Sequence, residues 1–260
     1  MEEKNTANSK IAAVIKPRIY HQKKQKLEDV APLKTPFSVH IDVCSLCNFK
    51  CSFCFQADVL GKKEKKFPHG MMKMDLFKKT VDDLKAFPDK IKKIKIGNHG
   101  EPTLHPLLPK FIDYARKANV ADMIEVFTNG SKLNPKLNKE LVDSGLQRIN
   151  ISLEGLSSER YIKVAAAKID WNEFVGNVKD LYDYSRKKGD LNIYVKIVNH
   201  ASELKGETVF SMTDQEKDYF YKTFGNIADE IYIEKIVPQW AETQEGKQNE
   251  VELTGMYDQK

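Results

Sequence analysis

The cysteines of this chain are confined to one short segment, at Cys44, Cys47, Cys51 and Cys54. A disulfide framework spreads its cysteines to tie distant segments together, whereas closely spaced thiolates wrap around one inorganic centre. A structural zinc site would need about a dozen residues between its two Cys-x2-Cys pairs, and here the pairs are much closer together. The spacing therefore favours an iron–sulfur cluster, with zinc and a ferredoxin-type electron carrier as alternatives.

The last three cysteines form the pattern Cys47-x3-Cys51-x2-Cys54, with the aromatic Phe53 just before the third. This pattern resembles the signature of the radical S-adenosylmethionine (radical SAM) enzymes. The resemblance implies that three thiolates hold a [4Fe-4S] cluster and leave one iron open for the amino and carboxylate groups of SAM. In that family the cluster's electron splits SAM into methionine and a 5'-deoxyadenosyl radical. Cys44 has no place in the pattern, and we interpret it as a spare thiol at a strand end, with a regulatory or alternative ligand as the other interpretation.

A second element after a strand-like run supports the resemblance. The segment 97–106 reads Gly-Asn-His-Gly-Glu-Pro-Thr-Leu-His-Pro and is similar to the Gly-Gly-Glu turn of the same family, with His99 in place of the first glycine. The resemblance implies that Glu101 makes a charge contact with the SAM ammonium and that Gly100 allows a close backbone approach. A lone Gly-Glu-Pro is a common turn, but its position at a strand end downstream of the cysteines favours the family element.

Two further segments follow in the order of the family. Phe127-Thr128-Asn129-Gly130 closes a third strand, and the segment 148–155 is similar to the family's ribose and carboxylate motif. From this resemblance we expect Ser152 and Glu154 to bind the hydroxyls or carboxylate of SAM. The remaining expected contacts are Phe53 beside the adenine, Asn129 at the cofactor, Asn199 near the nucleoside, and Lys196 with a carboxylate or phosphate.

The elements that must position these groups alternate from residue 36 to residue 240. Asn134-Pro135, Asp170-x-x-Glu173 and Thr213-x-x-Glu216 have the sequences of helix starts. Apolar stripes at helical spacing predict helices around residues 77–84, 174–181 and 220–227, and strands are predicted near 37–43, 91–97, 123–128, 148–154, 192–199 and 230–237. Six strand–helix units with parallel connections predict an α/β fold, a partial (β/α)6 TIM-like barrel with its helices outside. We expect residues 1–35 to form a polar, basic arm outside this core domain (36–240), and residues 241–260 a polar tail.

The predicted strands have one aliphatic and one polar face. In the strand at 148–154 the aliphatic face is Ile149, Ile151 and Leu153, and the polar face is Arg148, Asn150, Ser152 and Glu154. If the aliphatic faces meet the helices, the lumen is polar and can enclose a charged cofactor and a polar substrate. The alternative is an open sheet with its polar face in water. We expect the polar residues of the last two strands to lie nearer the substrate than the cluster; they are Tyr194, Lys196, Tyr232 and Glu234.

Composition excludes some classes of protein. The chain has 260 residues and a formal charge of +5, from 42 Lys+Arg against 37 Asp+Glu. This mild excess is typical of a solvated surface, so a nucleic-acid ligand stays open but is not favoured. No apolar run is long enough to span a bilayer, and the N-terminus shows no signal region. We therefore expect a cytoplasmic, reducing compartment, which suits an oxygen-sensitive cluster.

Together these observations predict a radical SAM enzyme that abstracts hydrogen from a small-molecule or peptide substrate, using an electron donor such as flavodoxin or ferredoxin. One alternative is a sensor or partner subunit that binds SAM and the cluster without catalysis, and another is an RNA-modifying radical SAM enzyme. The resemblance is to the catalytic domain of members that also carry a cysteine-rich C-terminal (SPASM) domain. Because no cysteine follows Cys54, this chain cannot hold auxiliary clusters of that kind with its own thiolates.

Overall fold

Parallel strands form the main sheet of the protein. The computed structural model describes residues 11–18, 26–54, 69–202 and 209–234. The sheet has seven strands in the order β1-β9-β6-β5-β4-β3-β2, and each neighbouring pair is parallel. The strands are β1 (Val14–Ile15), β2 (Ser38–Ile41), β3 (Ile91–Ile96), β4 (Ala121–Thr128), β5 (Arg148–Leu153), β6 (Asn192–Val198) and β9 (Glu230–Glu234). This arrangement confirms the predicted α/β fold with a parallel sheet.

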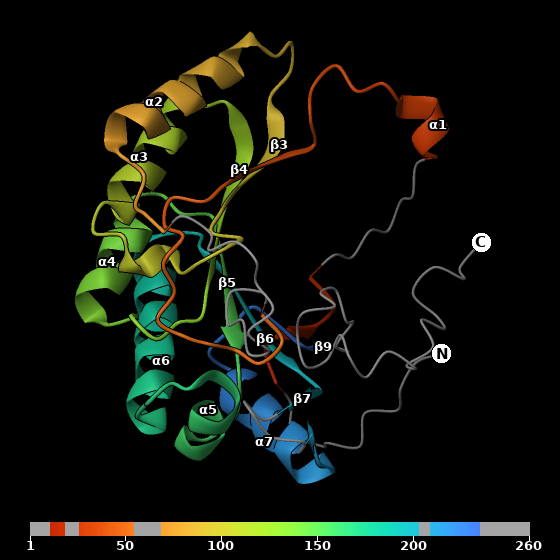
Figure 1. Cartoon of the computed structure of the whole chain (residues 1–260), viewed down its shortest axis with the longest axis vertical. Helices are drawn as coiled ribbons and strands as arrows, with labels where there is room; N and C mark the ends of the chain where they lie inside the picture. Colours follow the sequence, from red (N-terminus) through yellow and green to blue (C-terminus); the bar gives the residue numbers. More distant parts are fainter. Residues whose placement is uncertain (1–10, 19–25, 55–68, 203–208, 235–260) are drawn as a thin grey trace.

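Helices follow most strands and cover one face of the sheet. In Figure 1 the helices α2, α3, α4 and α6 stand along the same side of the strands. The helices are α1 (Leu27–Val30), α2 (Met74–Asp83), α3 (Leu108–Ala118), α4 (Pro135–Asp143), α5 (Ser158–Ala165), α6 (Trp171–Lys188) and α7 (Asp214–Phe224), with short 3-10 turns η2 (Leu84–Ala86) and η3 (Pro102–Leu104). After β6 a separate antiparallel pair forms, β7 (His200–Ser202) with β8 (Val209–Ser211). No helix in the described ranges is long and apolar enough to cross a membrane.

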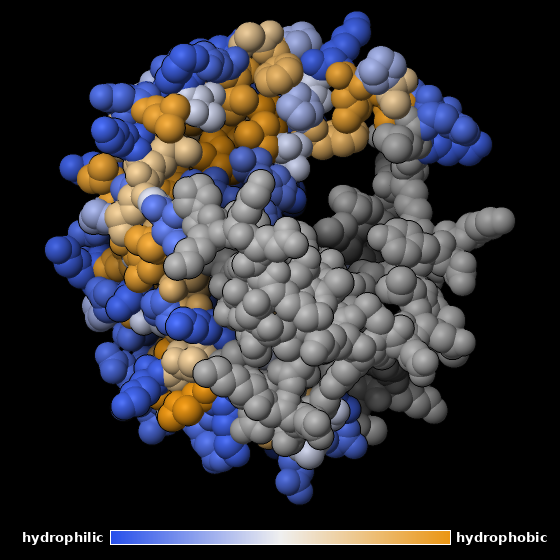
Figure 2. Space-filling view, viewed as in Figure 1, coloured by the Kyte–Doolittle hydropathy of each residue, from blue (hydrophilic) through white to orange (hydrophobic). Residues whose placement is uncertain are grey.

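The predicted helix starts are confirmed by their caps. The Asn134 side chain accepts hydrogen bonds from two backbone N–H groups at the start of α4, and Asp170 does the same for α6. At α7, Thr213 and Glu216 form a reciprocal capping box. Each cap satisfies N–H groups that the first turn of a helix leaves without a partner. Figure 2 shows hydrophilic residues along the outer margin where α2 to α6 lie, as expected for helices with one buried face.

The two faces of the strands separate as predicted. The aliphatic side chains of β5 belong to the main hydrophobic core, together with Phe174 and Leu181 of α6. On the opposite, inner face, which we call the lumen, Asn150 is fully buried and Glu125 is 1% exposed. An open sheet would leave this polar face in water, so the burial of these groups favours the predicted polar lumen.

Residues 11–18 lie against the sheet, whereas the sequence predicted an arm outside the core there. Val14 pairs with Glu230, so β1 extends the sheet beyond β9, and Ala13 is buried. Beyond β1, the Arg18 guanidinium lies 5.1 Å from the centroid of the Phe127 ring on the inner face of β4. Without β1, β9 would be an exposed edge with unpaired backbone groups. A strand of two residues has too little periodicity to be recognised in a sequence. The predicted tail at 241–260 lies outside the described residues.

Candidate functional site

The cysteine loop, which runs from Cys44 to Cys54, begins at the carboxyl end of β2. Cys44 is fully buried in the hydrophobic core, and its thiol donates to the Leu46 carbonyl at 3.7 Å. Cys47 is exposed, and Cys51 and Cys54 are half-buried. Cys44 is therefore packed into the fold, whereas the other three cysteines are at least partly exposed as residues.

Helix α5 holds the cysteine loop in place. The Lys50 N–H donates to the Ala165 carbonyl at 2.8 Å, and the Ser52 N–H donates to the Val164 carbonyl at 2.9 Å. These acceptors are among the last carbonyls of the helix, which have no partner within it. Phe49 also packs edge-on against a tyrosine of α5, with 5.8 Å between the ring centroids. The middle of the loop is thus attached by both backbone and side chains to a helix that the sequence analysis did not predict.

Electrostatic coupling groups three of the thiols together. Partial burial of the thiol, together with the charges of Glu101, Cys54 and Glu154, raises the pKa of Cys47 to about 11, while a hydrogen bond from the Phe49 N–H opposes the shift. Burial also raises the pKa of Cys51, with contributions from Glu154, Cys54 and Cys47. The charges that act on Cys44 do not include these thiols. The charges of Cys47, Cys51 and Cys54 thus act on one another but not on Cys44, and the role of these three cysteines as cluster ligands stays a prediction.

The donors of the loop suit an iron–sulfur cluster, because thiolates are the usual ligands of such clusters. Cys47, Cys51 and Cys54 lie in one loop, and two of them are half-buried. Within the described ranges no three or more His, Cys, Asp or Glu side chains converge on one metal position.

The turn after β3 packs directly against the cysteine loop. Gly100 has a φ of +92°, and a Cβ at this position would lie 2.2 Å from the Cys44 carbonyl oxygen. The next residue, Glu101, donates its N–H to the Leu46 carbonyl at 2.7 Å. Only glycine fits such an approach with this backbone conformation. The predicted close approach is therefore present, and it is made to the cysteine loop.

Asp42, at the end of β2, fixes the same turn from the other side. Its Oδ1 accepts hydrogen bonds from the N–H groups of Asn98 at 2.6 Å and His99 at 3.0 Å. Its Oδ2 lies 2.9 Å from Nδ1 of His99. His99, which stands where the family has its first glycine, thus has a local partner that a glycine could not have.

The Glu101 carboxylate lies beneath the turn and is 1% exposed. Its Oε1 accepts from the Thr103 N–H at 3.0 Å, the Thr103 hydroxyl at 2.5 Å and the Thr128 hydroxyl at 2.6 Å. Its Oε2 accepts from the Asn129 N–H at 2.7 Å. Burial raises the pKa of Glu101, and these donors oppose that shift. The carboxylate therefore ties the ends of β3 and β4 together, and its predicted contact with SAM stays a prediction.

Asn129 connects the end of β4 to the cysteine loop. Its amide donates to Oδ1 of Asn48 at 3.0 Å, while its own Oδ1 accepts from the N–H and hydroxyl of Ser131. Asn48 in turn donates to the Ser131 hydroxyl at 2.8 Å. This residue was predicted at the cofactor, and the structure places it in the framework that positions the loop.

Glu154 lies at the end of β5 against the cysteines. Burial dominates and raises its pKa to about 7, against the opposing effects of a hydrogen bond with the Cys51 thiol and the charge of Lys196. Its Oε2 is buried and has no hydrogen-bond partner within the described part of the chain. A buried acceptor of this kind fits a donor from a bound molecule, such as a SAM hydroxyl.

The other residues predicted to contact SAM differ in the partners that the structure gives them. Ser152 stands beside Lys196 in the register of β5 and β6, and the Lys196 ammonium pairs with Glu234 at 2.6 Å. The charge of Lys196 also lowers the pKa of Glu154. Lys196 therefore lies near the carboxylate beside the cysteines, although we expected its strand to lie nearer the substrate. Asn199 donates its N–H to the Glu234 carbonyl at 2.7 Å. Phe53 is half-buried, and its packing on the adenine stays a prediction.

A buried charge network lies deeper in the lumen. Arg148 forms two hydrogen bonds with Glu230, at 3.0 and 2.8 Å, and a third with Asn192 at 2.6 Å. Glu230 also pairs with Lys16 at 3.1 Å, and Glu125 lies 3.8 Å from Arg148. Paired charges with satisfied hydrogen bonds can remain buried. This network therefore forms the floor of the lumen.

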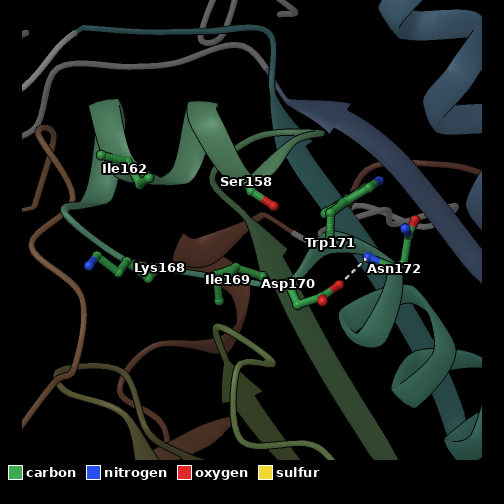
Figure 3. A pocket seen from close by; sticks show the side chains of 7 residues that line it. All are labelled: Ser158, Ile162, Lys168, Ile169, Asp170, Trp171 and Asn172. Carbon is green, nitrogen blue, oxygen red and sulfur yellow. Dashed lines mark hydrogen bonds between the residues drawn. The ribbon is translucent and has the colours of Figure 1, made fainter.

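Two surface depressions differ in their relation to these groups. The larger depression has a volume of about 620 Å³ and lies between α5 and the start of α6 (Figure 3). Its lining residues are Ser158, Ile162, Lys168, Ile169, Asp170, Trp171 and Asn172. None of the predicted site residues lines it. A smaller cleft borders Glu154 and is lined by Gly155, Leu156, Arg160, Ile197, Val198, Phe210, Met212 and Glu216. Of the two depressions, only the smaller cleft borders Glu154, which forms a hydrogen bond with the Cys51 thiol.

Comparison with known proteins decides the family. The model of the radical SAM superfamily matches residues 41–222. The chain belongs to this superfamily. It is therefore a radical SAM enzyme, and its cofactors are a [4Fe-4S] cluster and SAM.

The curated relatives of this radical SAM enzyme carry different activities in their names. A tungsten-containing aldehyde ferredoxin oxidoreductase cofactor-modifying protein of Pyrococcus furiosus is 29% identical over 151 residues, which are 58% of this chain and 40% of the relative. A probable GTP 3',8-cyclase of Methanococcus maripaludis is 26% identical over 225 residues, which are 77% of this chain and 70% of the relative. The chain thus spans well under two thirds of the first of these relatives.

Solved structures share the fold. SuiB of Streptococcus suis, bound to the precursor peptide SuiA, aligns with a TM-score of 0.60 and 14% identity over 81% of this chain and 42% of its own. The protein anSMEcpe with bound AdoMet aligns with a TM-score of 0.55 and 20% identity over 78% of this chain and 52% of its own. Both match only part of the longer protein.

Proposed function

We propose that this radical SAM enzyme holds SAM between the cysteine loop and Glu154, and holds its substrate deeper in the polar lumen. The observation that supports this most strongly is the buried Oε2 of Glu154, which has no hydrogen-bond partner within the described residues, beside a cysteine loop held in place by α5 and Gly100. When bound, the reduced cluster and SAM supply a 5'-deoxyadenosyl radical that abstracts a hydrogen atom from the substrate.

The residues of the chain would position the reactants. The three thiolates would hold the cluster, and the turn at Gly100 would keep the cysteine loop in place. The free Oε2 of Glu154 would accept a hydrogen bond from SAM, with Ser152 next along the same face of β5. Such positioning decides which hydrogen atom meets the radical, because the reacting atoms must approach to near contact.

The substrate is a small molecule or a peptide in this proposal. One set of relatives is named for a reaction of GTP, and one structural neighbour is bound to a precursor peptide. A polar lumen suits either class, since each buried polar group needs a partner. A flavodoxin or ferredoxin would supply the electron. A protein that bound SAM and the cluster without cleaving SAM would fit the same family match and is the alternative.

Anaerobic reconstitution tests the proposal. The full chain is loaded with iron and sulfide, its absorbance and iron content are recorded, and 5'-deoxyadenosine is measured after addition of SAM and dithionite. Alanine at Cys47, Cys51 or Cys54 should abolish the cluster absorbance, because the loss of one of three thiolates removes an anchor. Cys44→Ala is the matched control and should keep the cluster. SAM binding without deoxyadenosine formation would contradict the catalytic proposal.

A further inference from the structure

We propose that Arg18 and the lumen face of β3 form a binding site for a phosphate group of the substrate. This inference rests on the proposed function, because it places the substrate in the same lumen. The charged side chains concerned lie on the lumen face near the carboxyl ends of β2, β3 and β4.

The register of the strands brings several of these side chains into one row. His40 of β2 pairs with Lys95 of β3, which pairs with Glu125 of β4. Lys93 lies on the same face as Lys95, one step nearer the start of β3, and is 41% exposed in its side chain. Phe127 lies on the same face of β4 as Glu125, two residues nearer the carboxyl end, and the Arg18 guanidinium lies over its ring. The row is therefore lined with cations on one side of the lumen.

The carboxylates nearby are already engaged with other cations. Glu125 lies 3.8 Å from Arg148 and 4.0 Å from Lys93. Glu230 is held by two hydrogen bonds from Arg148 and by Lys16 at 3.1 Å. Asp42, whose charge acts on His40, is likewise engaged, with the N–H groups of the next turn and with the His99 ring.

Within the described ranges, neither Arg18 nor Lys95 forms an ion pair, although both are half-buried. Burial lowers the pKa of Lys95, and the charges of Arg18 and Lys93 lower it further against the opposite effect of Glu125. Burial likewise lowers the pKa of His40, and Lys95 adds to that shift. Like charges held together in a partly buried place repel one another, and an anion between them would remove that cost.

The charge and shape of this group suit phosphate. Arg18 presents a planar fork of donors, and Lys95 presents a compact point charge; both bind phosphate oxygens in proteins. A phosphate monoester carries close to two negative charges at neutral pH, which matches two unpaired cations. The ring of Phe127 lies 5.1 Å from the guanidinium carbon and supports it from one side.

Calorimetric titration of the full reconstituted chain tests this site. Inorganic phosphate is the probe, and malonate, a dianion with carboxylates, is the second arm. Phosphate should bind the wild-type protein, and Lys95→Gln and Arg18→Gln should each weaken binding by about tenfold or more, because each removes a charge-assisted contact. Lys92→Gln is the matched control: Lys92 lies on the same strand, is exposed and pairs with Asp122, so phosphate binding should not change.

Several results would overturn the inference. They are the absence of phosphate binding to the wild-type chain, an equal loss in Lys92→Gln, or malonate binding as tight as phosphate binding. Melting curves separate a ligand site from a structural role: Lys95→Gln should melt at the wild-type temperature or above, because repulsion is relieved, and a lower melting temperature would contradict the site. Deoxyadenosine formation by the wild-type protein tests the proposed function independently, since no phosphate takes part in that assay.

Discussion

Replacement of Glu101 by Gln should weaken the fold itself, before any ligand binds. The carboxylate receives three hydrogen bonds at Oε1 and one at Oε2, all from donors of the chain. A glutamine has one acceptor oxygen and one donor group. If its oxygen takes the position of Oε1, its NH2 group faces the Asn129 N–H, which lies 2.7 Å from Oε2 in the wild-type protein.

The expected cost follows from these contacts. One buried N–H loses its acceptor, and three charge-assisted hydrogen bonds become neutral, so the free energy of unfolding should fall by about 3 kcal/mol. For a chain of this size that corresponds to a melting temperature lower by about 6–12 °C.

The measurement is denaturant and thermal unfolding of the cluster-free chain, so that SAM plays no part. Glu140→Gln on α4 is the matched control, because it makes the same chemical change at an exposed glutamate and should leave stability unchanged. Unfolding of Glu101→Gln within about 0.5 kcal/mol of wild type would refute the reasoning. Titration of the reconstituted variant with SAM then tests the predicted ammonium contact separately.

Three further predictions concern the framework of the site. Gly100→Ala should destabilise the chain by at least about 2 kcal/mol and reduce cluster loading, because its φ is +92° and its Cβ would lie 2.2 Å from a backbone oxygen. Denaturant unfolding and iron content measure the two effects. Gly70→Ala is the control, because no atom lies within 4 Å of its Cβ, and it should change neither quantity. Arg148→Met should cost about 3–5 kcal/mol in denaturant unfolding, because it leaves buried carboxylates without their cation, and a smaller loss would show that the floor is solvated. A double-mutant cycle between Lys196→Met and Glu234→Gln should give a coupling of about 1 kcal/mol or less, as their side chains are 22% and 25% exposed, and a larger coupling would mean that water is excluded there.

Much of the fold could be predicted because its signals are local and repeated. The alternation of Ile149, Ile151 and Leu153 with polar neighbours correctly predicts which face of β5 meets the helices. Asn134 and Thr213 mark helix starts through side chains that cap the first turn, and such caps depend on residues only two or three positions apart. Cys44 is fully buried in the hydrophobic core, whereas the choice of the last three cysteines as cluster ligands stays a prediction.

The parts that could not be predicted depend on contacts between distant segments. The two-residue strand β1 is recognised only through its partner β9. The Glu101 carboxylate was expected to face SAM, and nothing in its own neighbourhood reveals the hydroxyl of Thr128 that holds it underneath. The pairing of Lys196 with Glu234 requires knowledge of which strands are adjacent. An unpaired charge is equally invisible in a sequence, because it is defined by the neighbours that are missing.

The attachment of the cysteine loop to α5 sets an order of events in the cell. Lys50 and Ser52 are synthesised long before Val164 and Ala165, whose carbonyls hold them. At ordinary elongation rates the ribosome needs on the order of ten seconds to make the intervening segment. During that interval the thiols have left or are leaving the ribosome without the scaffold that shapes their loop. Iron delivered then would meet flexible, competing thiols, so maturation into the native loop is a step that follows translation of α5.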